Sequence, residues 1–211
     1  MYRVVLYLSW VAFFVASSTV EAETLTVSFS GAVTTVPTEL SSTFFVSDPI
    51  TGSFEIDSLS PDFDADPTRG EYIGPTNFSF EFGSYLSTGP GGSGSDSVSV
   101  QNTTLDTFGF NVQCSAGRCI AADVGAYFLA SMRLSLTDST ATAFSSDALP
   151  TSLDINDFDN DEVALIFEHA TLPLKVVSGE ISSVTLVPEP STSLLGMTAM
   201  LFVAGLRRLR A

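Results

Sequence analysis

Apolar residues recur at every second position through most of this chain, and the alternation limits what it can fold into. The pattern occurs in eight stretches, at residues 25–29, 54–56, 78–82, 98–100, 108–112, 128–136, 163–167 and 184–186. A period of two indicates half-buried β-strands. The residues in between are mostly Ser, Thr, Glu and Asn, so one face of each strand meets water, which is typical of antiparallel sheets.

Two such sheets packed face to face form a sandwich. We therefore predict an all-β fold, an antiparallel β-sandwich that is jelly-roll-like. Of the 17 phenylalanines, 14 lie between residues 23 and 187 and most are at alternating positions. We interpret them as core fillers, the default role of a large apolar ring.

The first 22 residues have the pattern of a signal peptide. Arg3 supplies a positive flank, residues 4–16 form an apolar segment, and Val20-Glu21-Ala22 resembles a small-residue cleavage site. We expect the mature chain to begin at Glu23.

The last 24 residues also have the pattern of a targeting segment. Pro188-Glu189-Pro190 precedes an apolar run at residues 194–206, which is followed by Arg207, Arg208 and Arg210. An apolar run capped by arginines stops in a membrane with the arginines on the cytoplasmic side. Thirteen residues make about 20 Å of helix, which is shorter than a comfortable span. Such a segment suits a temporary anchor better than a permanent one.

The order of these three parts resembles the PEP-CTERM sorting signal of exported Gram-negative proteins. The resemblance implies that an exosortase-like membrane protease processes the chain near Pro188-Glu189-Pro190, and that extracellular polysaccharide is a partner. It also implies a transient stay in the inner membrane through the C-terminal helix, followed by transfer to the cell surface or extracellular matrix. The chain then divides into a signal peptide (1–22), a β-sandwich domain (23–187) and a sorting signal with a transmembrane segment (188–211).

Charge is strongly unbalanced within the predicted domain. It contains 22 acidic residues, because only Glu21 and Glu189 lie outside it. Its four basic residues are Arg69, Arg118, Arg133 and Lys175. The resulting net charge of −18 makes nucleic acid an unsuitable partner, because binding phosphates requires clustered cations. Solubility, divalent cations and cationic polymers remain as explanations.

Cys114 and Cys119 flank a four-residue segment between two strand patterns. An exported protein meets an oxidising compartment, so we predict a disulfide between them. Metal binding by two thiols and a redox role are the alternatives.

Two aspartate-rich loops are the candidate cation sites. Their alternating carboxylates are Asp62, Asp64 and Asp66 in the first loop, and Asp157, Asp159 and Asp161 in the second. Calcium takes six to eight oxygen ligands, which such loops supply. The alternative is that these aspartates initiate and cap solvated turns.

Catalysis has little support in the sequence. His169 is the single histidine, and no glycine pattern of a nucleophile elbow accompanies it. A carbohydrate-binding sandwich is a stronger rival. Residues 23–187 contain no Trp, so the available aromatic platforms are Tyr72, Tyr85 and Tyr127, and Tyr72 and Tyr85, which flank the strand of Phe78, are the two expected to be exposed. We expect a structural or adhesive protein and not an enzyme. The alternatives are a calcium-assisted glycan-binding module and a glycan-active enzyme.

Overall fold

The computed structural model describes residues 24–90, 96–114 and 118–188. In it the eight alternating stretches form one antiparallel sheet together with residues 69–73 and 85–90, which the alternation did not predict as strands. The strands are β1 (Thr24–Thr35), β2 (Pro49–Asp57), β3 (Arg69–Ile73), β4 (Asn77–Phe82), β5 (Tyr85–Pro90), β6 (Ser97–Asn102), β7 (Asp106–Gln113), β8 (Phe128–Asp138), β9 (Asn160–Glu168) and β10 (Lys175–Pro188). Short 3-10 helices, η1 (Thr38–Leu40) and η3 (Ile155–Asp157), lie in the connections.

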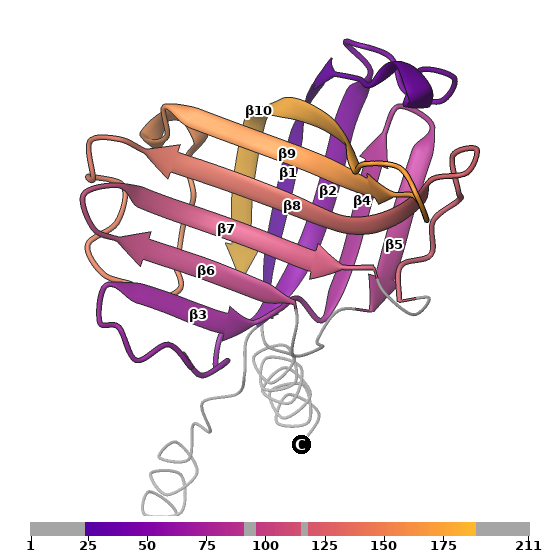
Figure 1. Cartoon of the computed structure of the whole chain (residues 1–211). Coiled ribbons are helices and arrows are strands. Elements are labelled where there is room, and N and C mark those ends of the chain that lie inside the picture. Colours follow the sequence, from indigo (N-terminus) through magenta and orange to yellow (C-terminus); the bar gives the residue numbers. More distant parts are fainter. Residues whose placement is uncertain (1–23, 91–95, 115–117, 189–211) are drawn as a thin grey trace, which may run out of the picture. The chain divides into compact units, whose positions relative to one another are not determined.

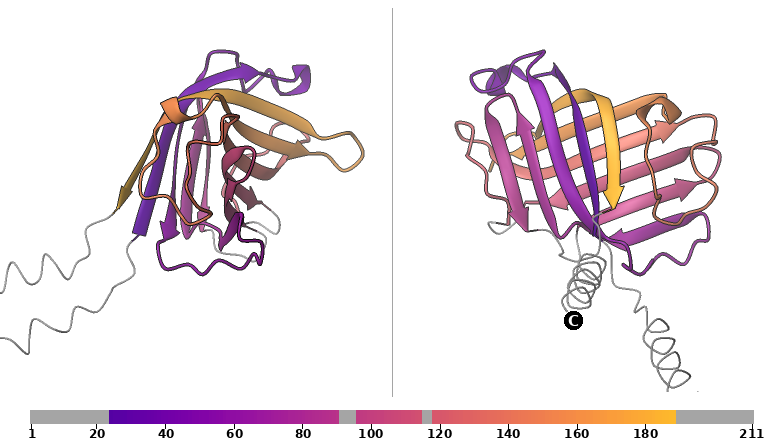
Figure 2. Two further views of the ribbon diagram at one scale, coloured as in Figure 1. Left: turned by 90° about the vertical axis from the view of Figure 1, so that its left-hand side faces the viewer. Right: turned by 180° about the vertical axis from the view of Figure 1, so that it is seen from behind.

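The sheet curls so that its two halves face each other. Its strand order is β3-β6-β7-β8-β9-β10-β1-β2-β4-β5, with every neighbouring pair antiparallel. The half that contains β3, β6, β7, β8 and β9 lies in front in Figure 1, and β1, β2, β4 and β5 cross behind it at a steep angle. Figure 2 shows these layers from the side and from behind.

β10 belongs to both halves. It pairs with β9 from Lys175 to Gly179, and with β1 from Ser178 to Pro188. The predicted all-β antiparallel fold is therefore confirmed. The two facing layers, which the alternation predicted as separate sheets, are instead one continuous hydrogen-bonded sheet.

Aromatic rings fill the space between the two halves. Phe110 of β7 stacks on Phe54 of β2 with 4.2 Å between ring centroids, and on Phe80 of β4 with 5.3 Å. Phe80 in turn meets Phe29 of β1 edge to face at 5.0 Å. The prediction that most phenylalanines fill the core is confirmed at these positions, whereas Phe45, Phe63 and Phe128 are exposed.

The connection between β1 and β2 closes one end of this core. Leu40 of η1 and Phe44 are both fully buried. The ring of Phe44 packs against Tyr85 of β5 at 5.0 Å and against Phe167 of β9 at 5.6 Å. A single loop therefore contacts both halves of the sheet, and Lys175 of β10 holds it from outside through an ion pair with Glu39 at 2.5 Å.

The sheet turns its corner where β1 and β10 approach most closely. Ser30 pairs with Ser183 but Gly31 pairs with Ile181, so Ser182 is an extra residue in β10 and forms a bulge. A Cβ on Gly31 would lie 1.9 Å from the backbone oxygen of Glu180. Glycine at this position therefore permits the close backbone approach that the bend requires.

We expect Gly31→Ala to lower the free energy of unfolding by about 3 kcal/mol. The added Cβ would overlap a backbone oxygen, and a backbone atom cannot relieve the overlap by changing a side-chain rotamer. Gly109→Ala is the matched control. Gly109 also lies within a strand, but its added Cβ would meet the Ser99 hydroxyl at 2.6 Å, and a hydroxyl rotates away. Urea unfolding of both variants measures the difference, and equal losses would contradict the role of Gly31 at the corner.

Candidate functional site

Asp138 is the last residue of β8, and its side chain accepts hydrogen bonds from the segment that connects β8 to β9. Its Oδ1 accepts hydrogen bonds from the N–H and the hydroxyl of Thr140 at 2.7 and 2.6 Å. Its Oδ2 accepts from the N–H groups of Thr142 and Ala143 at 2.7 and 2.9 Å, and from the Thr142 hydroxyl at 3.1 Å. These hydrogen bonds, led by the one from the Thr140 hydroxyl, hold the pKa of Asp138 well below its ordinary value.

Asp106 of β7 lies directly opposite Asp138, and both side chains are buried on the inner face. The Oδ2 of Asp106 accepts a hydrogen bond from the N–H of Phe144 at 2.7 Å. Its Oδ1 is buried and has no hydrogen-bond partner among the described residues. We call Asp106 and Asp138 the aspartate clasp. Like charges opposite each other are unfavourable in a sheet, so the clasp depends on the donors that the connection supplies.

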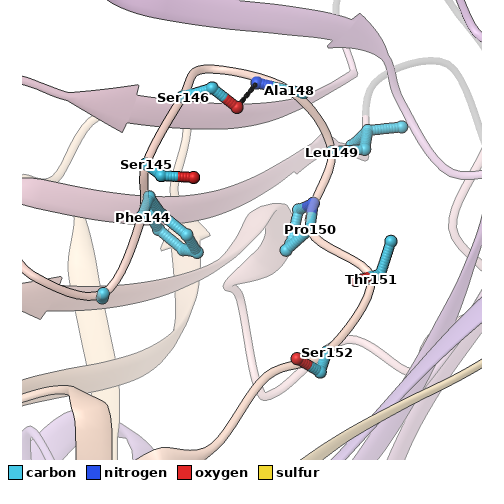
Figure 3. A pocket seen from close by; sticks show the side chains of 9 residues that line it. Phe144, Ser145, Ser146, Ala148, Leu149, Pro150, Thr151 and Ser152 are labelled. Carbon is cyan, nitrogen blue, oxygen red and sulfur yellow. Dashed lines mark hydrogen bonds between the residues drawn. The ribbon is translucent and has the colours of Figure 1, made fainter.

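The connection between β8 and β9, which the clasp holds, lines an open pocket of about 250 Å³ (Figure 3). Its lining consists of Ala143, Phe144, Ser145, Ser146, Ala148, Leu149, Pro150, Thr151 and Ser152. The loop is stiffened locally by a hydrogen bond of 3.3 Å from the N–H of Ala148 to the Ser146 hydroxyl. The pocket is thus made almost entirely by one segment.

The chemistry of this pocket is that of a weak polar binding site. Four hydroxyl side chains line it, together with the apolar surfaces of Phe144, Leu149 and Pro150. The described lining has no ionisable side chain to exchange a proton or to activate one of the hydroxyls as a nucleophile. The described lining supplies hydroxyl groups and apolar surface, and it supplies no acid or base.

The first aspartate loop uses its carboxylates to shape the backbone. The Oδ1 atoms of Asp62, Asp64 and Asp66 accept hydrogen bonds from the N–H groups of Asp64, Asp66 and Thr68, at 2.9, 2.9 and 3.0 Å. Each bond spans two residues, so the loop is a series of Asx turns. The other oxygen of Asp64 pairs with the Arg69 Nε at 2.7 Å. The hydroxyl and N–H of Thr68 lower the pKa of Asp66.

The second aspartate loop connects elements of the sheet. Asp159 accepts hydrogen bonds from the N–H and the hydroxyl of Ser139, and Asp161 accepts one from the N–H of Ile181 in β10. Asp157 is exposed at the end of η3. In the part of the chain that the structure describes, no three His, Cys, Asp or Glu side chains are grouped to hold a metal ion. Calcium binding at either loop stays a prediction.

The predicted disulfide joins Cys114 and Cys119, whose Cα atoms are 4.9 Å apart. The segment after it covers part of β5, an edge strand of the sheet. Ile120 and Thr88 exchange both backbone hydrogen bonds, at 2.6 and 3.1 Å. Covering an edge in this way removes a template for pairing with other chains.

A buried ion pair anchors the same segment to the other half of the sheet. Asp96 precedes β6 and its side chain is fully buried. One carboxylate oxygen accepts a hydrogen bond from the N–H of Gln113 at 3.0 Å, and the other pairs with Arg118 at 2.5 Å.

The sequence patterns predicted no role for Asp96, Asp106 or Asp138. The signal for two of them was available, since Asp106 and Asp138 continue the inward alternation of their strands.

The expectation that Tyr72 and Tyr85 form exposed platforms is wrong. Their exposed fractions are 6% and 5%. Both rings belong to the core, and their hydroxyls donate to the backbone oxygens of Asp147 and Ala122, each at 2.9 Å. Burial raises the pKa of both tyrosines. They lie at inward positions of β3 and β5, where a hydroxyl within reach of a loop carbonyl makes a tyrosine acceptable in the core.

His169 follows β9 and has a local structural role. Its Nδ1 accepts a hydrogen bond from the N–H of Thr171 at 3.1 Å, and its ring lies 5.2 Å from that of Tyr127. These contacts tie the ring to the turn between β9 and β10.

Among the predicted sorting residues, Pro188 is the last residue of β10 and is exposed. Glu189, Pro190, Arg207, Arg208 and Arg210 lie outside the described residues, as does the whole predicted signal peptide. No helix within the described segments has the length and apolar character to cross a bilayer.

Comparison with known proteins finds no family model, no curated protein and no solved structure that matches this chain.

We expect Asp138→Asn to destabilise the domain at pH 7 and to speed hydrogen exchange at Thr140, Thr142 and Ala143, because an amide replaces an acceptor that holds three N–H groups. The folded-state pKa of Asp138 is lowered. The contribution of Asp138 to the free energy of unfolding is therefore complete above the unfolded-state pKa of about 4, and this contribution is lost as the pH falls below that value. The difference in unfolding free energy between wild type and variant should therefore shrink from pH 4 toward pH 2. Asp157→Asn, at an exposed loop position, is the control, and a pH-independent difference for Asp138→Asn would contradict the clasp.

We expect the double variant Cys114→Ser/Cys119→Ser to lose about 2 kcal/mol of unfolding free energy, because the disulfide closes a short loop and removes little chain entropy. Denaturant unfolding measures this loss, and reduction of the wild-type protein should reproduce it. Stability unchanged by both treatments would show that the bond does not restrain the segment over β5.

Proposed function

We propose that this chain is a structural or adhesive protein that is exported to the cell surface or extracellular matrix. In this proposal an N-terminal signal peptide directs export, and the C-terminal helix holds the chain in the inner membrane until an exosortase-like protease acts near Pro188-Glu189-Pro190. The delivered part is a jelly-roll-like sandwich, and its proposed environment contains extracellular polysaccharide.

The observation that carries this proposal is the order of the targeting patterns around the sheet. The apolar segment at residues 4–16 precedes β1, and the Pro-Glu-Pro motif, the apolar run at residues 194–206 and the arginines come at or after the end of β10. Cleavage after residue 22 and near the Pro-Glu-Pro motif would remove the two proposed targeting segments from the described domain. β1 and β10 are also neighbours, and Leu25 pairs with Pro188, so the chain enters and leaves the domain at adjacent points.

A structural role outside the cytoplasm is supported by the restraints within the domain. The carboxylates of the first aspartate loop are engaged by backbone N–H groups and by Arg69. The disulfide agrees with an oxidising compartment outside the cytoplasm.

The test is the intact mass and the C-terminal peptide of the native protein, recovered separately from inner membrane and from extracellular matrix. We expect the matrix form to begin at Glu23 and to end near Pro188-Glu189-Pro190. We expect the inner-membrane form to retain Arg210, because the arginines hold the apolar segment on the cytoplasmic side. A matrix form that still carries Arg210, or a chain confined to the inner membrane, would contradict processing and release.

A further inference from the structure

A short segment of the connection between β7 and β8 pairs with β5, which is the last strand at one edge of the described sheet (Figure 1). Thr88 of β5 exchanges both backbone hydrogen bonds with Ile120 of this segment, at 2.6 and 3.1 Å. A Cβ on Gly89 would lie 2.4 Å from the backbone oxygen of Arg118, so the two backbones are in close contact. We call residues 118–122 the edge guard.

Three restraints hold the edge guard against β5. The disulfide joins Cys119 of the guard to Cys114, directly after β7 in the other half of the sheet. Arg118 pairs with the buried carboxylate of Asp96 at 2.5 Å. A tyrosine hydroxyl of β5 donates to the backbone oxygen of Ala122 at 2.9 Å. The ion pair and the hydrogen bond open and close reversibly, so the disulfide is the restraint that holds the guard covalently.

The strand under the guard is a template for pairing with another strand. Residues two apart in an antiparallel strand direct their N–H and C=O groups to the same side. Thr88 directs its groups to the guard, so Leu86 also directs its groups away from β4. The backbone hydrogen bonds from the described guard to β5 are those at Thr88, and Leu86 is 51% exposed. The edge therefore offers two pairing residues, of which the guard occupies one.

This edge is complementary to itself. Two copies of β5 can lie antiparallel about a two-fold axis at Ser87, which sets Leu86 of one copy opposite Thr88 of the other. Each of these two residue pairs exchanges two backbone hydrogen bonds, because both residues direct their groups toward the partner strand. A pairing in which the same surface of both copies meets is closed, so it ends at a dimer.

Charge does not oppose pairing at this edge, although the domain has 22 acidic and four basic residues. Leu86, Thr88 and Pro90 of β5 are uncharged, and the charged residue that β4 pairs with β5 is Glu81. In the dimer the two copies of Glu81 would lie three strand spacings apart, about 14 Å. That separation exceeds the Debye length of about 8 Å at physiological ionic strength, so salt screens their repulsion.

We propose that β5 is an edge for pairing with a second copy of this chain, and that the disulfide closes the edge by holding the guard on it. In the oxidised chain the guard occupies Thr88, so the complete set of hydrogen bonds to a second copy cannot form. A dithiol reductant supplies two electrons that break the S–S bond, which leaves thiols at Cys114 and Cys119 while the dithiol becomes a disulfide. The second copy then competes with a guard that is held only by reversible contacts. This inference does not depend on the proposed route of export.

The experiment measures self-association of the full chain in detergent by sedimentation velocity over a range of concentrations. We expect the dithiol-treated wild type and Cys114→Ser/Cys119→Ser to dimerise at least about ten-fold more tightly than the oxidised wild type. The apolar segments at residues 4–16 and 194–206 are the same in every protein, so their own association does not alter the comparison.

Two further substitutions in the Cys114→Ser/Cys119→Ser chain assign the dimer to β5. Thr88→Pro removes the N–H that bonds to the second copy, at a position on an edge strand where proline is tolerated, and should return self-association to the oxidised level. Thr88→Val is the matched control, because it keeps this N–H, and should dimerise as its parent does. Thermal unfolding shows whether both proteins are folded.

The pairing edge is overturned if the reduced protein associates no more than the oxidised one, or if Thr88→Pro and Thr88→Val associate equally. Should Thr88→Pro fail to fold, hydrogen exchange of the Cys114→Ser/Cys119→Ser chain decides instead. The N–H groups of Leu86 and Thr88 should exchange more slowly as protein concentration rises, and exchange that is independent of concentration would contradict a dimer through β5.

Discussion

The bend of β10 from one half of the sheet to the other is the constraint on which the rest of the structure depends. Its first residues hydrogen-bond to β9 and its later residues to β1. This bend brings Phe110 of one half against Phe54 and Phe80 of the other. Because burial of such rings is the main source of stability in a small β domain, the core exists only if the corner forms. The bulge at Ser182 and the bare backbone of Gly31 make that corner sterically allowed.

Buried aspartates fasten the long connections to this curled sheet. Asp138 and Asp106 hold the segment after β8, and Asp96 holds the segment that carries the disulfide. A connection without regular structure leaves several backbone N–H groups unpaired, and a carboxylate accepts more than one of them. The acidic composition of the domain therefore has a structural part at the strand ends as well as a solvated part on the surface.

The pairing of β1 with β10 also relates the fold to the proposed route of the protein. The first and last described strands are neighbours, and Leu25 pairs with Pro188, so the two ends of the described sheet lie side by side.

The sequence alone determined eight of the described strands, the disulfide and most of the aromatic core, because these depend on alternation and on neighbours close in the chain. It missed β3 and β5, and it included Phe128, which is exposed, in the apolar alternation of β8. Tertiary structure decided what depends on distant contacts. Tyr72 and Tyr85 have the aromatic side chains expected of surface platforms. Their hydroxyls instead donate hydrogen bonds to the loop carbonyls of residues 147 and 122, which makes burial of the rings favourable. Likewise, Ser28 and Ser79 are ordinary outward residues until the strand order sets them beside Ser53, since only the register of pairing joins separate strands into one row.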